Sequence, residues 1–73
     1  MDITLRVRLV GGESMDVTYD EPGTSDPATV ADHAIAALGS DHGSLRASHG
    51  GRLVVLFSRG VAAVEIAPRG AVL

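Results

Sequence analysis

The sequence contains no cysteine, lysine, asparagine, glutamine or tryptophan. Without cysteine, the chain can form neither a disulfide nor a thiolate metal site. Without lysine, it cannot form a Schiff base or place a lysine in a phosphate-binding loop. A domain of 73 residues buries only about 60% of the surface that its unfolded chain exposes, so its stability margin is small. Association with another chain is therefore a candidate source of the additional stability that disulfides supply in other small domains.

The charge and hydropathy of the chain argue against further classes of protein. A net charge of −3 does not suit a protein that coats nucleic acid through bulk charge. No apolar run approaches the roughly 20 residues needed to span a bilayer, and the first residues alternate instead of forming a continuous secretion-signal segment. We therefore expect one globular domain over residues 1–73, cytoplasmic or part of a particle assembled there. The abundance of alanine, glycine, valine and arginine indicates a GC-rich genome.

The first part of the chain predicts a β-hairpin. Residues 2–9 alternate apolar and polar side chains, and residues 14–19 do the same. A three-residue loop, Val10-Gly11-Gly12, keeps the apolar faces of the two strands together, whereas a two-residue loop would oppose apolar to polar side chains. Gly12 then occupies the left-handed position of the loop. The expected cross-strand pairs are Leu5 with Val17, Val7 with Met15, and Arg6 with Asp16.

The middle of the chain predicts one helix. Asp26 is a suitable N-cap, and Pro27 suits the first helical position. Gly39 suits the end of the helix. The apolar side that we expect to face the sheet consists of Val30, Ala31, Ala34, Ile35 and Leu38.

A second hairpin is expected between residues 45–48 and 52–57. By the same reasoning as before, the loop His49-Gly50-Gly51 places Gly51 in the left-handed position. In this register Ala47 faces Leu53, and the apolar side chains on the outer face, away from the helix, are Val54 and Leu56.

The connection Ser58-Arg59-Gly60 leads to a final apolar strand. A three-residue loop would put Gly60 in the left-handed position, with Val64 and Ile66 on the outer face. A four-residue loop would turn these two side chains inward and place Glu65 in solvent. We favour the second arrangement because it exposes the charge.

The elements follow the order β-β-α-β-β-β, which predicts an α+β fold: a mainly antiparallel sheet with one helix packed on one face. This order resembles the layout of ubiquitin-like β-grasp proteins, and a partly closed barrel or an open sheet fits it as well. The carrier members of that group end in Gly-Gly. This chain ends in Gly70-Ala71-Val72-Leu73, so we expect no conjugating or sulfur-carrier role.

The histidines are the strongest candidates for a metal site. If the strand between His42 and His49 is extended, its seven steps of ~3.3 Å separate them by roughly 23 Å, too far to share a zinc ion. His33 and His42 are conceivable partners, with Asp32 or Asp41 as further ligands, but no standard ligand spacing occurs. We expect polar surface histidines and no metal or other cofactor.

Catalytic motifs are missing as well. The sequence has no G-x-S-x-G elbow, G-x-G-x-x-G loop or Walker motif. A single sheet with one helix leaves little room for a substrate pocket of about 300 Å³. We therefore expect no catalytic residue and no enzymatic activity.

The strand at residues 52–57 is apolar on both faces, and one helix can cover only one of them. Sheet curvature, the C-terminal residues or another subunit must cover the other. We expect an interaction or assembly module that binds itself or a larger assembly, such as an accessory protein of a phage or another particle. The candidate interface residues are Arg6, Arg8, Arg46, Arg52, Val54 and Leu56.

The alternative is a small regulator whose arginine-bearing face binds nucleic acid or another polyanion. Readers of single-stranded nucleic acid usually add aromatic side chains on which bases stack. The only aromatic residues are Tyr19 and Phe57, and the alternation places both toward the core. Nucleic acid is therefore the less favoured partner.

Overall fold

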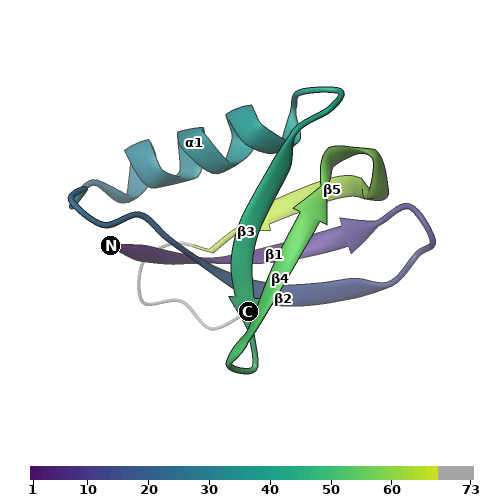
Figure 1. The fold of residues 1–73 in the computed structure, drawn as a ribbon, viewed down its shortest axis with the longest axis horizontal. Helices are drawn as coiled ribbons and strands as arrows, with labels where there is room; N and C mark the ends of the chain where they lie inside the picture. The colour runs from purple at the N-terminus through teal and green to yellow at the C-terminus, as the bar shows by residue number, and fades with distance from the viewer. Residues whose placement is uncertain (68–73) are drawn as a thin grey trace.

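The computed structural model describes residues 1–67. It confirms the expected order of elements and the α+β class: five strands form one sheet, and one helix packs against it (Figure 1). The elements are β1 (Asp2–Leu9), β2 (Ser14–Asp20), α1 (Pro27–Leu38), β3 (Ser44–His49), β4 (Arg52–Phe57), a short 3₁₀ helix η1 (Ser58–Gly60) and β5 (Val61–Ile66). Within this part of the chain no helix is long and apolar enough to cross a bilayer.

The strand order is β4-β3-β2-β1-β5, and every neighbouring pair is antiparallel. In a flat sheet the two edge strands would lie four spacings apart, about 19 Å. The chain from Phe57 to Val61 is only four residue steps long and spans at most about 14 Å. The sheet must therefore curl until β4 and β5 approach each other at η1. Figure 1 shows this curl, with β3 and β4 crossing in front of β1 and β2.

The curled sheet is not a closed barrel, because β4 and β5 do not pair. The bend falls between β2 and β3, whose ladder consists of the single pair Thr18 and Ser48. Of the arrangements that fit this order of elements, the structure has an open sheet that is curled but not closed into a barrel. The resemblance to β-grasp proteins remains one of element order along the chain.

The first hairpin has the expected register. Leu5 faces Val17, and Arg6 faces Asp16. The Leu9 amide donates to the Glu13 carbonyl at 2.8 Å, which leaves the three-residue loop that the alternation predicts. Gly12 has a φ of 99°, so its left-handed conformation is confirmed.

The second hairpin does not have the expected register. His49 faces Arg52, and Ala47 faces Val54, so the loop contains only two residues. Gly50 and Gly51 have φ values of 56° and 79°, as a type I′ turn requires at both central positions. The left-handed Gly51 is confirmed, but the three-residue loop is wrong. The two-residue type I′ turn is favoured over the three-residue loop because its backbone twist matches that of the flanking strands.

The changed register exchanges the two faces of β4. Leu56 is buried with 5% of its surface exposed, and Val54 packs against the core. Their predicted place on the outer face is therefore wrong. The outer face carries Leu53, Val55 and Phe57 instead, so the core position predicted for Phe57 is also wrong.

The last strand pairs with β1 and not with β4. Val64 lies opposite Val7, which is fully buried, and Glu65 lies opposite Arg6 on the outer face. The favoured orientation of β5 is thus confirmed, although no hairpin loop produces it, and Ile66, opposite the buried Leu5, remains 37% exposed. The left-handed conformation predicted for Gly60 is wrong, because this residue belongs to η1 and its φ is not positive.

The helix begins as predicted. The Asp26 side chain accepts a hydrogen bond from the Ala28 amide at 3.1 Å, and Pro27 is the first helical residue. The apolar side of the helix is narrower than expected, because Val30 and Ala34 are buried whereas Ile35 is 52% exposed. The helix covers the inner faces of β1 and β3.

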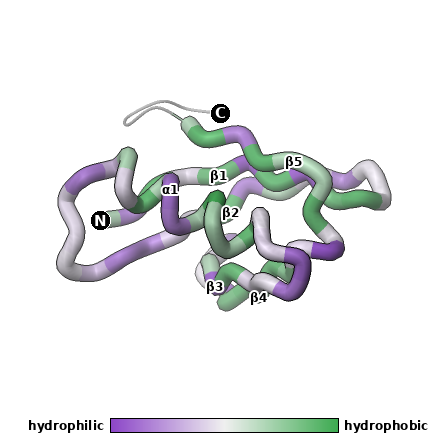
Figure 2. The backbone as a smooth tube through the Cα atoms, turned by 90° about the horizontal axis from the view of Figure 1, so that it is seen from above, coloured by the Kyte–Doolittle hydropathy of each residue, from purple (hydrophilic) through white to green (hydrophobic). Residues whose placement is uncertain are grey.

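The core lies between the helix and the concave side of the curled sheet. In Figure 2 the hydrophobic residues are concentrated on the strands, and the loop that leads from β2 to α1 is white and purple. The largest fully buried side chains are Leu5, Val7, Val17 and Val30.

Candidate interaction surface

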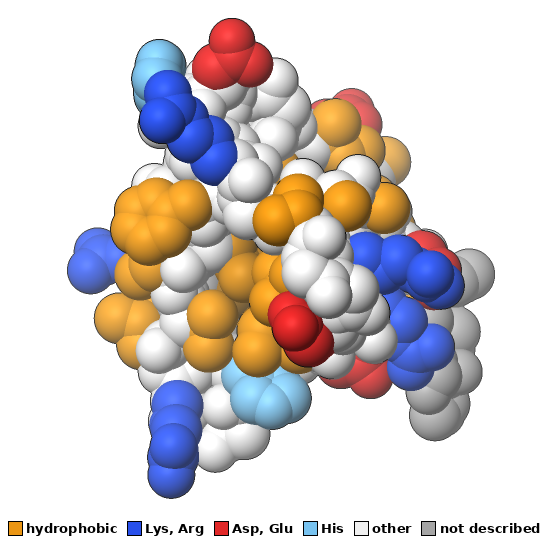
Figure 3. All heavy atoms as spheres, turned by 90° about the vertical axis from the view of Figure 1, so that its right-hand side faces the viewer, with side chains coloured by type: hydrophobic (Ala, Val, Ile, Leu, Met, Phe, Trp, Pro, Cys, Tyr) orange, Lys and Arg blue, Asp and Glu red, His pale blue; other side chains and the backbone are white. Residues whose placement is uncertain are grey.

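The outer face of β4 carries the most concentrated group of exposed apolar side chains in residues 1–67. Leu53 and Phe57 are each 66% exposed and Val55 is 39% exposed. We call these three residues the β4 strip. Figure 3 shows hydrophobic side chains gathered at the left and centre of the face that it presents, with arginine side chains around them. The other exposed large apolar residues within residues 1–67 lie apart from one another: Val10 in the β1–β2 turn, Ile35 on α1 and Ile66 at the end of β5.

The backbone amides and carbonyls of the β4 strip are exposed, like its side chains. β4 is an edge strand, paired only with β3 in the sheet that residues 1–67 form. The Ser58 amide donates to the Gly43 carbonyl at 2.9 Å. Hydrogen bonding alternates along an antiparallel ladder, so Leu56, Val54 and Arg52 also bond toward β3. The amides and carbonyls of Leu53, Val55 and Phe57 consequently point away from the sheet.

Two arginines of the outer face, Arg6 and Arg8, are paired with acidic side chains. The Arg6 guanidinium binds the Asp16 carboxylate through two hydrogen bonds, of 2.9 and 3.2 Å. This bond lowers the pKa of Asp16 from its ordinary value. Arg8 lies 3.6 Å from Glu65, which also faces Arg6 across the strands. Two acids and two arginines therefore form one balanced group.

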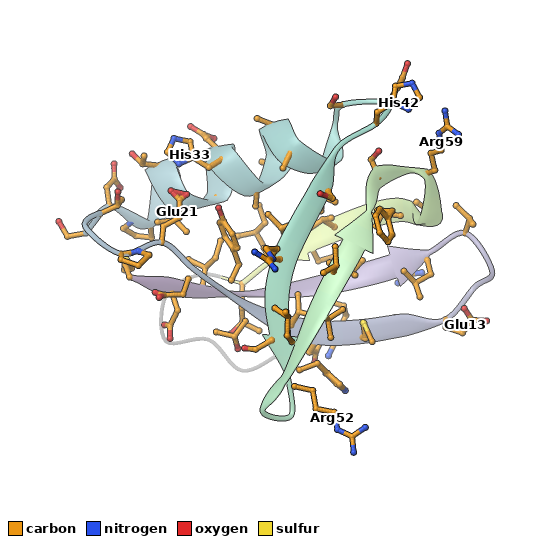
Figure 4. All side chains as sticks on the ribbon, in the orientation of Figure 1. Glu13, Glu21, His33, His42, Arg52 and Arg59 are labelled. Carbon is orange, nitrogen blue, oxygen red and sulfur yellow. The ribbon has the colours of Figure 1, made fainter. Side chains whose placement is uncertain are left out.

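The remaining two arginines of the predicted interface do not join that group. Arg46 lies on the outer face of β3, directly opposite Val55. Arg52 shares the face of Val54 and Leu56 by alternation, at the exposed end of β4 (Figure 4). The six predicted interface residues are thus divided between the outer face, the core and a strand end.

The three histidines lie in three different places. His49 contacts the Asp16 carbonyl through Nδ1 at 2.6 Å. His42 accepts a hydrogen bond from Arg59 at 3.1 Å, and His33 lies beside Glu21 (Figure 4). Over residues 1–67 no group of three or more histidine, aspartate or glutamate side chains is placed to hold a metal ion.

One polar cluster could not be predicted from the sequence. Glu21, in the loop after β2, lies 2.5 and 2.6 Å from Nδ1 of His33 on α1, and it accepts a hydrogen bond from the Tyr19 hydroxyl at 3.1 Å. The His33 contact lowers the pKa of Glu21. Burial and the Glu21 carboxylate raise the pKa of Tyr19. The cluster fastens the helix to the end of β2.

A second polar group lies where η1 meets the loop before β3. Asp41, His42, Ser58 and Arg59 line an open hollow there together with Phe57. The hydroxyl oxygen of Ser58 is buried and has no hydrogen-bond partner within residues 1–67. Because Phe57 belongs to both, the hollow adjoins one end of the β4 strip.

Comparisons with known proteins place the chain in no family. No family model matches it, and neither a curated protein nor a solved structure shows significant similarity to it.

Proposed function

We propose that this protein is a non-enzymatic interaction module that associates with itself through the β4 strip. The observation that carries the proposal is the coincidence of exposed apolar side chains and unpaired backbone groups on one edge strand. An exposed apolar edge strand is a template for pairing with another chain. The strip replaces Val54 and Leu56 as the apolar part of the interface.

The energetics of a small domain support the same proposal. The chain has no disulfide, and its 73 residues build a small core. Burial of an apolar side chain contributes about 25 cal/mol per Å² removed from water. Covering the β4 strip therefore stabilises both the contact and the fold.

The balanced pairing of Arg6 and Arg8 with Asp16 and Glu65 weakens the rival proposal. A polyanion would have to displace two carboxylates that already bind these arginines. No aromatic residue lies beside them to stack a base, since Phe57 belongs to the β4 strip and Tyr19 lies on the inner face. Self-association is the function that the surface supports best.

Light scattering or sedimentation on the purified protein at micromolar concentration tests the proposal. We expect a mass above that of the monomer for the wild type, and a folded monomer for Val55→Asp. Val10→Asp is the matched control, because Val10 is equally apolar and 68% exposed but lies in the β1–β2 turn. Should Val55→Asp fail to fold, Phe57→Asp serves in its place. A monomeric wild type contradicts the proposal.

A further inference from the structure

We infer that two copies of this chain pair through β4, antiparallel and in one register, around a two-fold axis that passes between the two copies of Val55. The inference rests on the proposed function and gives it a geometry. The two five-stranded sheets would become one continuous sheet. The occupant of the β4 edge is thus a second copy of the same strand.

The backbone of β4 selects the register. Only Leu53, Val55 and Phe57 direct their amides and carbonyls outward. A two-fold axis at Val55 pairs Val55 with Val55 of the second copy, and Leu53 with Phe57 of the second copy. Each of these is a hydrogen-bonded pair, in which both residues exchange an amide and a carbonyl. All outward groups of the strip are then satisfied.

The neighbouring registers satisfy fewer groups. A shift of two residues in one direction sets Phe57 against Gly51, which lies in the type I′ turn. A shift of two in the other direction sets Leu53 against Arg59, which lies in η1. A shift of one residue opposes outward groups to groups that already bond to β3. The strand is therefore self-complementary in one register only.

The side chains agree with this register. A two-fold axis perpendicular to the sheet keeps the strips of both copies on the same face. Leu53 then packs beside Phe57 of the second copy, and Val55 packs beside its own equivalent. Aromatic and β-branched cross-strand pairs of this kind stabilise antiparallel sheets. On the inner face, the half-buried Val54 meets Leu56 of the second copy.

No charge on β4 opposes the pairing. Natural edge strands are protected by lysine, proline or inward-pointing charges. The one charged residue of β4 is Arg52, which shares the inner face but lies at the strand end, outside the segment from Leu53 to Phe57. In the inferred register Arg52 lies opposite Ser58 of the second copy. The hollow beside Ser58 carries one acid, Asp41, and one arginine, Arg59. The approaching Arg52 therefore meets no net charge.

The pairing surface is short, since β4 has six residues. An interface of this size falls at the lower end of specific protein contacts. We therefore expect a reversible dimer that forms at micromolar concentration, and not a permanent complex.

Disulfide trapping reads the register directly, because the chain contains no cysteine of its own. The Cα atoms of a hydrogen-bonded antiparallel pair lie about 5.5 Å apart, within the range that a disulfide bridges. We expect Val55→Cys to form a covalent dimer under mild oxidation. Leu53→Cys alone and Phe57→Cys alone should not, because each would lie roughly 13 Å from its equivalent.

The crossed sample is the decisive one. Leu53→Cys mixed with Phe57→Cys should give a mixed covalent dimer, since these residues face each other in the inferred register. Val10→Cys, exposed in the β1–β2 turn, measures random collision and should cross-link at least tenfold more slowly than Val55→Cys.

The outcomes separate the register from the function. A dimer in which another pair is trapped in place of Val55 overturns the register and leaves self-association standing. A wild type that is monomeric throughout overturns both. A monomer that dimerises only after removal of residues 68–73 overturns both for the intact chain and assigns the strip to an occupant within it. An open series of larger species overturns the two-fold axis.

Discussion

At the scale of single residues, positive φ angles restrict two turn positions to glycine. Gly12 and Gly51 have φ values of 99° and 79°, a region in which a Cβ atom approaches the following carbonyl. No atom lies within 4 Å of the position that a Cβ would take at either residue. The cost of a side chain there is thus conformational and not steric crowding by neighbours.

We expect Gly12→Ala and Gly51→Ala each to lower the free energy of unfolding by about 1–2 kcal/mol, the usual cost of a left-handed residue with a side chain. Gly60→Ala is the control, because Gly60 has an ordinary φ and equal free space, and it should change stability by less than about 0.5 kcal/mol. Urea denaturation with the same slope for all variants measures the difference. Equal midpoints for all three would contradict the turn conformations.

Also at the scale of single residues, the protonation of Glu21 makes the stability of the fold depend on pH. Its folded pKa is lowered, first by the hydrogen bond with His33 and less by Tyr19, while burial acts in the opposite direction. A lowered folded pKa means that the unfolded chain binds the proton more tightly. The contribution of Glu21 is therefore complete above its ordinary pKa of about 4.3 and is lost as the pH falls through the lower folded value.

We expect Glu21→Gln to reduce the dependence of stability on pH below about pH 4.3. Asp16, whose pKa Arg6 also lowers, contributes with the same sign, so a part of the acid dependence should remain in the variant. Chemical denaturation of both proteins between pH 3 and pH 7 measures the slopes. Identical slopes would show that the contact between Glu21 and His33 does not form in solution.

At the scale of the elements, the two hairpins show what a pattern of residues can determine. β1 and β2 alternate strictly, so only one loop length keeps their apolar faces together, and the register was predictable. β4 is apolar on both faces, so either register buries apolar side chains and the alternation carries no information. The register of this hairpin is therefore decided by the turn, where two consecutive glycines permit a type I′ conformation.

The place of β5 could not be predicted from the sequence for a related reason. Its pairing with β1 depends on the curl that brings the two sheet edges together at η1. No local pattern encodes that curl. The inward direction of Val64 followed from the exposure of Glu65 alone, which holds whichever strand lies alongside. The candidate interface was predictable as far as a doubly apolar strand, but not as to which of its faces is free.

Substitutions on the two faces of β4 should therefore have opposite effects. Leu56 is 5% exposed, and Leu56→Ala should cost about 2–5 kcal/mol of stability, the usual effect of truncating a buried leucine. Leu53→Ala, on the 66% exposed side, should leave the stability of the monomer within about 0.5 kcal/mol. Urea denaturation at a protein concentration low enough to favour the monomer gives both values. The reverse order of effects would restore the three-residue loop and return Val54 and Leu56 to the surface.

At the scale of the whole molecule, the curl of the sheet covers its inner face but leaves the outer face and the edge of β4 open to solvent. A flat sheet of five strands with a single helix would leave its second face open, and the curl brings the inner faces of β4 and β1 around a common core. The outer face of β4 gains nothing from this arrangement, and its edge keeps unpaired backbone groups. Folding of the single chain thus uses the inner face of β4, whereas the proposed association would use its free edge and outer face.

The proposed association would couple stability to protein concentration. If the native state associates and the unfolded state does not, mass action stabilises the native state as the protein concentration rises. We expect the thermal midpoint of the wild type to increase across a hundredfold concentration range that spans the dissociation constant, on the order of micromolar. Val55→Asp should unfold at one midpoint throughout, and Val10→Asp should behave as the wild type. A wild-type midpoint that does not change with concentration would mean that the β4 strip is exposed for a partner other than a second copy, since a contact between copies has to respond to their number.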